Sequence, residues 1–88
     1  MRYSIKTSKS FKKDLKSIQH KPNYMAMIND AIGKLKEGKR LPRQHALKGK
    51  MKGLLECHLP FGKLLVWKLE ESVVTLEYLR THHQLFGL

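Results

Sequence analysis

Apolar and polar positions alternate at the start of the chain and then change period. Tyr3 and Ile5 are separated by polar residues, which is the period-two pattern of a short strand. Phe11, Leu15 and Ile18 then recur at intervals of four and three residues with lysines between them, as in an amphipathic helix. The pattern therefore predicts one strand followed by one helix.

A second helix is expected from Pro22 to a stop at Gly38, because proline is favoured in the first turn of a helix and glycine just beyond the last. Its apolar residues share one side of the helix and are Tyr24, Met27, Ile28, Ala31 and Leu35. Each helix thus has one apolar stripe, and two such helices cannot bury both stripes alone. The rest of the chain must supply a surface that they cover.

Three runs of strand length fill the second half of the chain, at residues 54–59, 63–69 and 73–79. The connections between them, residues 60–62 and 70–72, are short enough for antiparallel hairpins. We therefore predict an α+β fold of order β-α-α-β-β-β(-β). In this fold the two N-terminal helices pack on one face of a small, mainly antiparallel sheet.

The period-two pattern also divides the side chains of the first of these strands between its two faces. Leu55, Cys57 and Leu59 share one face and are expected in the core. Glu56 and His58 share the other face, which the helices leave uncovered. Both side chains are therefore expected to face outward.

Composition limits the partners and the compartment. Eighty-eight residues, 41% of them hydrophobic, fit one globular domain over residues 1–88. The formal net charge of +11 predicts association with polyanions such as nucleic acid or the ribosome. The single Cys57 cannot form an internal disulfide, and no apolar run is long enough to cross a membrane. We expect a cytoplasmic protein with no membrane partner.

Three histidines, His45, His58 and His82, precede, occupy and follow the predicted strands. Imidazole has an ordinary pKa of about 6.5, so a chain that binds polyanions and presents several histidines has the groups for proton transfer on RNA. The sequence has no cysteine pair and no glycine-rich phosphate loop, and the adjacent His82 and His83 would point apart on an extended segment. We therefore expect no metal site and no cofactor.

Four segments of the second half of the chain form a pattern of their own: HALKGKMKG (45–53), ECH (56–58), LLVWKL (64–69) and THHQLFG (81–87). Together they resemble the YafQ-like branch of the RelE/ParE toxin superfamily. That family has His-x-Leu-x-Gly-x-Trp-x-Gly, an acid two residues before a histidine, an apolar strand, and a closing Thr-His-x-x-Leu-Phe. In the first half only the pattern agrees, since SFKKD (10–14) is similar to the start of the family's first helix.

The resemblance implies a RelE-like fold and a toxin of a type II toxin-antitoxin system. Such a toxin is a ribosome-dependent endoribonuclease that cleaves mRNA in the A site and is held inactive by a cognate antitoxin. Carried over by position, the family's functional residues are His45, Glu56, His58, His82 and Phe86, with Glu56 replacing the more usual aspartate.

RNA cleavage without a metal needs a base for the 2′-hydroxyl proton, positive charge for the transition state and an acid for the leaving 5′-oxygen. We expect His58 and His82 to share the acid and base roles, and the sequence does not divide the roles between them. His45 is expected to take part as a third group, and Glu56 to orient a neighbouring imidazole or raise its pKa.

Charge, rather than the resemblance, indicates the phosphate contacts, which are Lys48, Lys50, Lys52 and Arg80. Phe86 either stacks on a base or ties the C-terminal tail to the core. The same positive charge predicts that the antitoxin presents an acidic segment, which folds as it binds.

The chain departs from the family pattern at two places. Met51 replaces a usual tryptophan, and Gly62 and Lys63 stand where the family commonly has Asp-Trp. Either Glu56 takes over the acidic role, or the active site is weaker or differently organised.

Two other functions are compatible with parts of the sequence. A ParE-like toxin that acts on gyrase would keep the fold without RNA cleavage, but that mechanism needs no group of histidines. A non-enzymatic module that binds nucleic acid would need only the basic residues.

Overall fold

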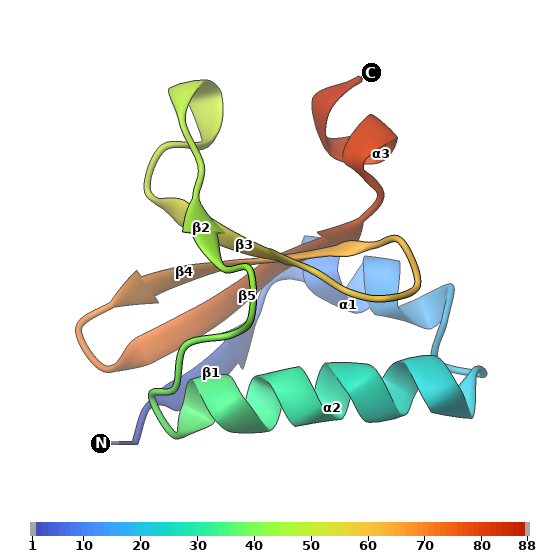
Figure 1. Cartoon of the computed structure of the whole chain (residues 1–88), viewed down its shortest axis with the longest axis horizontal. Coiled ribbons are helices and arrows are strands. Elements are labelled where there is room, and N and C mark those ends of the chain that lie inside the picture. Colours follow the sequence, from blue (N-terminus) through green and yellow to red (C-terminus); the bar gives the residue numbers. More distant parts are fainter. Residues whose placement is uncertain (1, 88) are drawn as a thin grey trace.

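The computed structural model describes residues 2–87, which form a five-stranded sheet and three α-helices. The strand order is β1-β5-β4-β3-β2, and β1 and β5 are parallel while the other neighbours are antiparallel. Because α1 and α2 cover one face of the sheet (Figure 1), the predicted α+β fold is confirmed. The elements are β1 (Ser4–Thr7), α1 (Lys9–Lys16), α2 (Pro22–Lys36), β2 (His45–Ala46), the 3₁₀ helix η1 (Gly49–Met51), β3 (Leu54–His58), β4 (Leu64–Glu70), β5 (Val73–Arg80) and α3 (His82–Phe86).

Local sequence signals fix the ends of the first two helices. Ser8 precedes α1, and its hydroxyl oxygen accepts a hydrogen bond of 2.9 Å from the N–H of Phe11. Pro22 occupies the first turn of α2, and Gly38, with a φ of 78°, follows its end. Both helices therefore lie close to their predicted positions. Within residues 2–87 no helix combines the length and the apolar character that crossing a bilayer requires.

The core lies between these helices and the covered face of the sheet. Phe11, Ile28 and Trp67 are each 1% exposed. Cys57 is also buried, as predicted, and burial raises the pKa of its thiol, which favours the uncharged form. Met27 was expected in the apolar stripe of α2 but is 37% exposed, because it lines a groove of about 460 Å³ between α2 and the outer edge of β3.

The opposite face of the sheet is covered by neither α1 nor α2. Directly paired residues of an antiparallel sheet point to the same side, so the side chains on this face form rows. One row crosses β3, β4 and β5 and consists of His58, Leu64 and Arg80. The next row begins on β2 and consists of His45, Glu56, Val66 and Tyr78. The chain from β2 to η1 and helix α3 both project from the sheet on this side, away from α2 (Figure 1).

The structure contains two elements that differ from the prediction. His82 and His83 were expected on an extended segment but begin α3, whose first turn is closed by a capping box. There the Gln84 N–H donates to the Thr81 hydroxyl at 3.1 Å, and the Gln84 side-chain oxygen accepts from the Thr81 N–H at 2.9 Å. The Thr-x-x-Gln spacing is a local signal that predicts this helix.

His45 was expected to precede the strands but begins β2, which pairs with β3. A strand of two residues is too short to show a hydrophobic period, so the pattern of the sequence does not reveal it. Its position matters because it brings His45 opposite Glu56.

Candidate active site

A carboxylate and two imidazoles form a cluster on the uncovered face of the sheet. His45 Nε2 lies 2.5 Å from Glu56 Oε1, and His58 Nε2 lies 4.0 Å from the same oxygen. The centroids of the two imidazole rings are 6.3 Å apart. The cluster follows from the register, because His45 is paired with Glu56 and His58 is two residues further along β3 on the same face.

His45 has an acceptor at each ring nitrogen. Nδ1 lies 3.2 Å from the carbonyl oxygen of Arg43, and Nε2 faces the carboxylate of Glu56. A carbonyl oxygen and an ionised carboxylate can only accept, so both contacts are hydrogen bonds only when the ring carries a proton on each nitrogen. In that state His45 and Glu56 form an ion pair, and neither nitrogen of His45 is available to a substrate.

His58 is bound less tightly than His45. Its side chain is 49% exposed, and the 4.0 Å between its Nε2 and Glu56 Oε1 is too long for a hydrogen bond. The carboxylate is nevertheless near enough to attract a protonated His58 ring. His58 is therefore the member of the cluster whose ring is free to exchange a proton with a bound molecule.

Glu56 lies on the predicted face, but the prediction that it faces outward is wrong. Only 4% of the residue is exposed, because His45 on β2 and His58 on β3 lie beside its carboxylate. Its Oε2 is buried and has no hydrogen-bond partner within residues 2–87. A buried oxygen without a partner costs about 1–3 kcal/mol, so this oxygen of Glu56 lowers the free energy of unfolding.

His82 and Phe86 form a second group, on α3. Their ring centroids are 4.6 Å apart, as expected for residues four apart on a helix, and both side chains are exposed. Phe86 is 37% exposed, so it does not tie the tail into the core. Helix α3, which carries this pair, and the chain from β2 to η1 stand on the same side of the sheet, the side that α1 and α2 leave uncovered (Figure 1).

Among the residues that the structure describes, no three or more His, Cys, Asp or Glu side chains are placed to hold a metal ion.

Comparison with known families identifies the group of proteins to which these features belong. The family described as "Bacterial toxin of type II toxin-antitoxin system, YafQ" matches residues 3–87. This chain belongs to the YafQ family of toxins. A search of curated protein sequences gives no match.

Solved structures of bacterial toxins have the same fold as this chain. The metal-bound toxin from Helicobacter pylori is 34% identical, with a TM-score of 0.83 over 98% of this chain and 100% of that one. The E. coli DinJ-YafQ toxin-antitoxin complex contains a chain that is 27% identical, with a TM-score of 0.84 over 99% and 100%. The YoeB/ParE toxin from Agrobacterium tumefaciens, 23% identical with a TM-score of 0.77 over 90% and 98%, shares the fold alone.

The departures from the YafQ pattern fall at defined places in the structure. Gly62 lies in the turn between β3 and β4 with a φ of 87°, a conformation that favours glycine over aspartate. Its N–H donates to the Leu59 carbonyl, and the Leu59 N–H donates to the Lys63 carbonyl, so the backbone of this turn is well paired. In this chain the carboxylate nearest to His58 is therefore the one on β3, Glu56.

The four predicted phosphate contacts are divided between two elements. Lys48, Lys50 and Lys52 are exposed in the connection from β2 to β3, around η1. Arg80 ends β5 and belongs to the same row as His58. Its Nε donates to Asp14 Oδ2 at 2.9 Å, and its guanidinium carbon lies 4.5 Å from the centroid of the Tyr78 ring. Sequence patterns do not reveal Asp14, because it is 66 residues away from Arg80 along the chain.

Proposed function

We propose that this YafQ-family toxin is a ribosome-dependent endoribonuclease that cleaves mRNA in the ribosomal A site by histidine acid/base chemistry, without a metal ion. The observation that carries the proposal is the cluster of His45, Glu56 and His58 on the uncovered face of the sheet, with the His82 and Phe86 pair above the same face. Imidazole exchanges protons near neutral pH, and both groups are open to a large ligand.

The reaction requires two proton transfers. A base removes the proton of the ribose 2′-hydroxyl, whose oxygen forms a bond to the adjacent phosphorus. The bond from phosphorus to the 5′-oxygen breaks, and an acid protonates that oxygen. The products are a 2′,3′-cyclic phosphate and a 5′-hydroxyl. His58 and His82 are the proposed acid and base, because both ring nitrogens of His45 already face acceptors of the protein.

The remaining positions have supporting roles in this mechanism. Glu56 holds His45 beside His58. Arg80 stabilises the charge that develops on the phosphate, while Lys48, Lys50 and Lys52 bind backbone phosphates of RNA. The exposed ring of Phe86 stacks on a base.

The toxin is further proposed to bind a cognate antitoxin. The YafQ toxin of E. coli has been crystallised in complex with DinJ. With a net charge of +11, this chain suits a partner that presents an acidic segment, and such a segment can fold on contact and cover the basic surface.

The test is cleavage of a defined mRNA on purified ribosomes with an empty A site. The proposal predicts a cut within the A-site codon, seen by mapping of 5′ ends, and no comparable cut when ribosomes are omitted. Supercoiling by purified gyrase is measured in parallel. Inhibition of gyrase without RNA cuts would indicate the ParE-like function, and RNA binding with neither effect would indicate a non-enzymatic module.

A further inference from the structure

Two contacts of Arg80 fix its guanidinium group. Nε donates to the carboxylate of Asp14, and the plane of the group lies near the Tyr78 ring. The Arg80 side chain is 32% exposed and that of Asp14 only 13%, so the ion pair is partly shielded from solvent. An arginine carries five N–H groups, and this pair uses only the one on Nε. The four N–H groups on the two terminal nitrogens are not used by Asp14.

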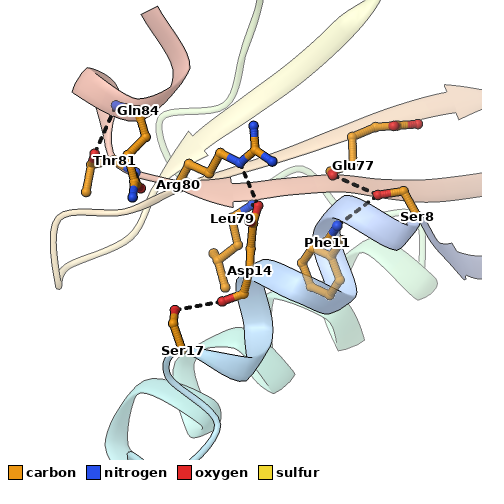
Figure 2. Close-up of polar contacts among 9 residues, drawn as sticks. All are labelled: Ser8, Phe11, Asp14, Ser17, Glu77, Leu79, Arg80, Thr81 and Gln84. Atoms are coloured by element: carbon orange, nitrogen blue, oxygen red, sulfur yellow. Dashed lines mark hydrogen bonds and ion pairs between the residues drawn. The ribbon is translucent and has the colours of Figure 1, made fainter. Parts of the chain in front are cut away.

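Asp14 is itself held at the edge of the sheet. The oxygen that binds Arg80, Oδ2, also accepts from the backbone N–H of Leu79 at 3.1 Å. β1 pairs with β5 only from Val73 to Leu76. Beyond Leu76, the backbone of β5 at this edge is hydrogen-bonded instead by a side chain of α1, Asp14, and by the N-cap of that helix, Ser8. Figure 2 shows the Asp14 side chain reaching from α1 to β5, where its Oδ2 contacts Arg80 Nε.

A second residue near α1 makes a similar contact with β5 but does not touch Arg80. The Ser8 hydroxyl donates to the carbonyl oxygen of Glu77 at 2.8 Å (Figure 2). Ser8 and Asp14 therefore both tie the first helix to the edge of β5, but only Asp14 combines this tie with a contact to a functional side chain. Ser8 is a matched control for any role of Asp14 that is only structural.

The position of Arg80 connects this pair to the candidate active site. His58, Leu64 and Arg80 are paired in register across three neighbouring strands, so the histidine and the arginine stand on the same face with one buried leucine between them. Two strand spacings separate their Cα atoms, which is about 10 Å. A phosphate over Leu64 is within reach of both side chains.

We infer that Asp14 is a positioning residue for RNA cleavage, which holds Arg80 by Nε so that its two terminal nitrogens face the scissile phosphate. Fixing Nε removes most of the freedom of a long side chain and directs the rest of the group toward the uncovered face. The inference rests on the proposed function, because it assigns Asp14 a part in the same reaction.

A double-mutant cycle of Asp14→Ala and Arg80→Ala tests whether Asp14 positions Arg80. The quantity measured is the single-turnover rate constant of mRNA cleavage on programmed ribosomes at saturating toxin. Arg80→Ala is expected to lower the rate constant about 10²-fold, and Asp14→Ala about tenfold. In the Arg80→Ala background, the Asp14→Ala change is expected to add less than about twofold, since its effect passes through the arginine. Ser8→Ala is expected to stay within about twofold of wild type.

The outcomes separate the inference from the proposed function. Multiplicative losses, in which Asp14→Ala costs as much without Arg80 as with it, would overturn the positioning role while the wild type still cleaves. A wild-type protein that does not cleave would overturn both. If Asp14→Ala fails to fold, Asp14→Asn replaces it, because its amide oxygen can still accept from the Leu79 N–H. Asp14→Asn is expected to lower the rate constant about threefold or more, again only when Arg80 is present.

Discussion

Replacement of His58 by alanine is expected to lower the single-turnover rate constant of mRNA cleavage by about 10²–10⁴-fold, the usual contribution of a general acid or base. The free energy of unfolding should change by less than about 0.5 kcal/mol, because the side chain is half exposed and makes no hydrogen bond to Glu56. Cleavage is followed on programmed ribosomes, and stability by urea denaturation monitored through Trp67.

His20→Ala is the matched control for this substitution. His20 is also exposed, but it lies in the turn between α1 and α2, far from the uncovered face. The control should cleave mRNA at the wild-type rate. Equal losses in the two variants, or a His58→Ala protein as fast as wild type, would remove His58 from the mechanism.

Replacement of Glu56 by methionine is expected to change stability and cleavage in opposite directions. Methionine fills a similar space without a polar group, so the buried oxygen that lacks a partner disappears. The His45 ring that remains is half exposed and can be solvated by water, so we expect the free energy of unfolding to rise by about 1 kcal/mol. Cleavage should fall about 10²-fold, because His45 loses its contact with Glu56 and is no longer held beside His58.

Glu70→Met provides the comparison for Glu56→Met. Glu70 is paired with Lys68 at the end of β4, where both side chains are about half exposed, and the glutamate raises the pKa of the lysine. Loss of such a surface pair changes stability by about 1 kcal/mol at most. This variant should keep wild-type cleavage. A Glu56→Met protein that is less stable than wild type and still cleaves would show that Glu56 is a structural residue.

The parts of the site that lie on one strand follow from the sequence alone. The alternation along residues 54–59 places Glu56 and His58 on one face and Cys57 in the core, and both placements hold. The helix at His82 is also encoded locally, in the spacing of Thr81 and Gln84. Period-two reasoning alone misses it, because the helix is only five residues long.

The contacts that join distant segments do not follow from local patterns. The burial of Glu56 depends on the two-residue strand that brings His45 beside it. The Asp14 and Arg80 pair depends on how α1 packs against the unpaired part of β5. In both cases the residue types suggest a polar contact, but the partner is determined by tertiary packing. Gly62, which stands where the family commonly has an aspartate, has a φ of 87°, a conformation that favours glycine.

In the proposed mechanism, histidines from β3 and α3 act together on one phosphodiester, over the uncovered face of the sheet. The most direct test is cleavage of A-site mRNA by the His58→Ala, His82→Ala double variant, compared with wild type and both single variants under single-turnover conditions. The double variant is expected to give no cut above background in the A-site codon, while it remains folded and still binds ribosomes. Cleavage by the folded double variant at a rate near that of wild type would contradict this mechanism.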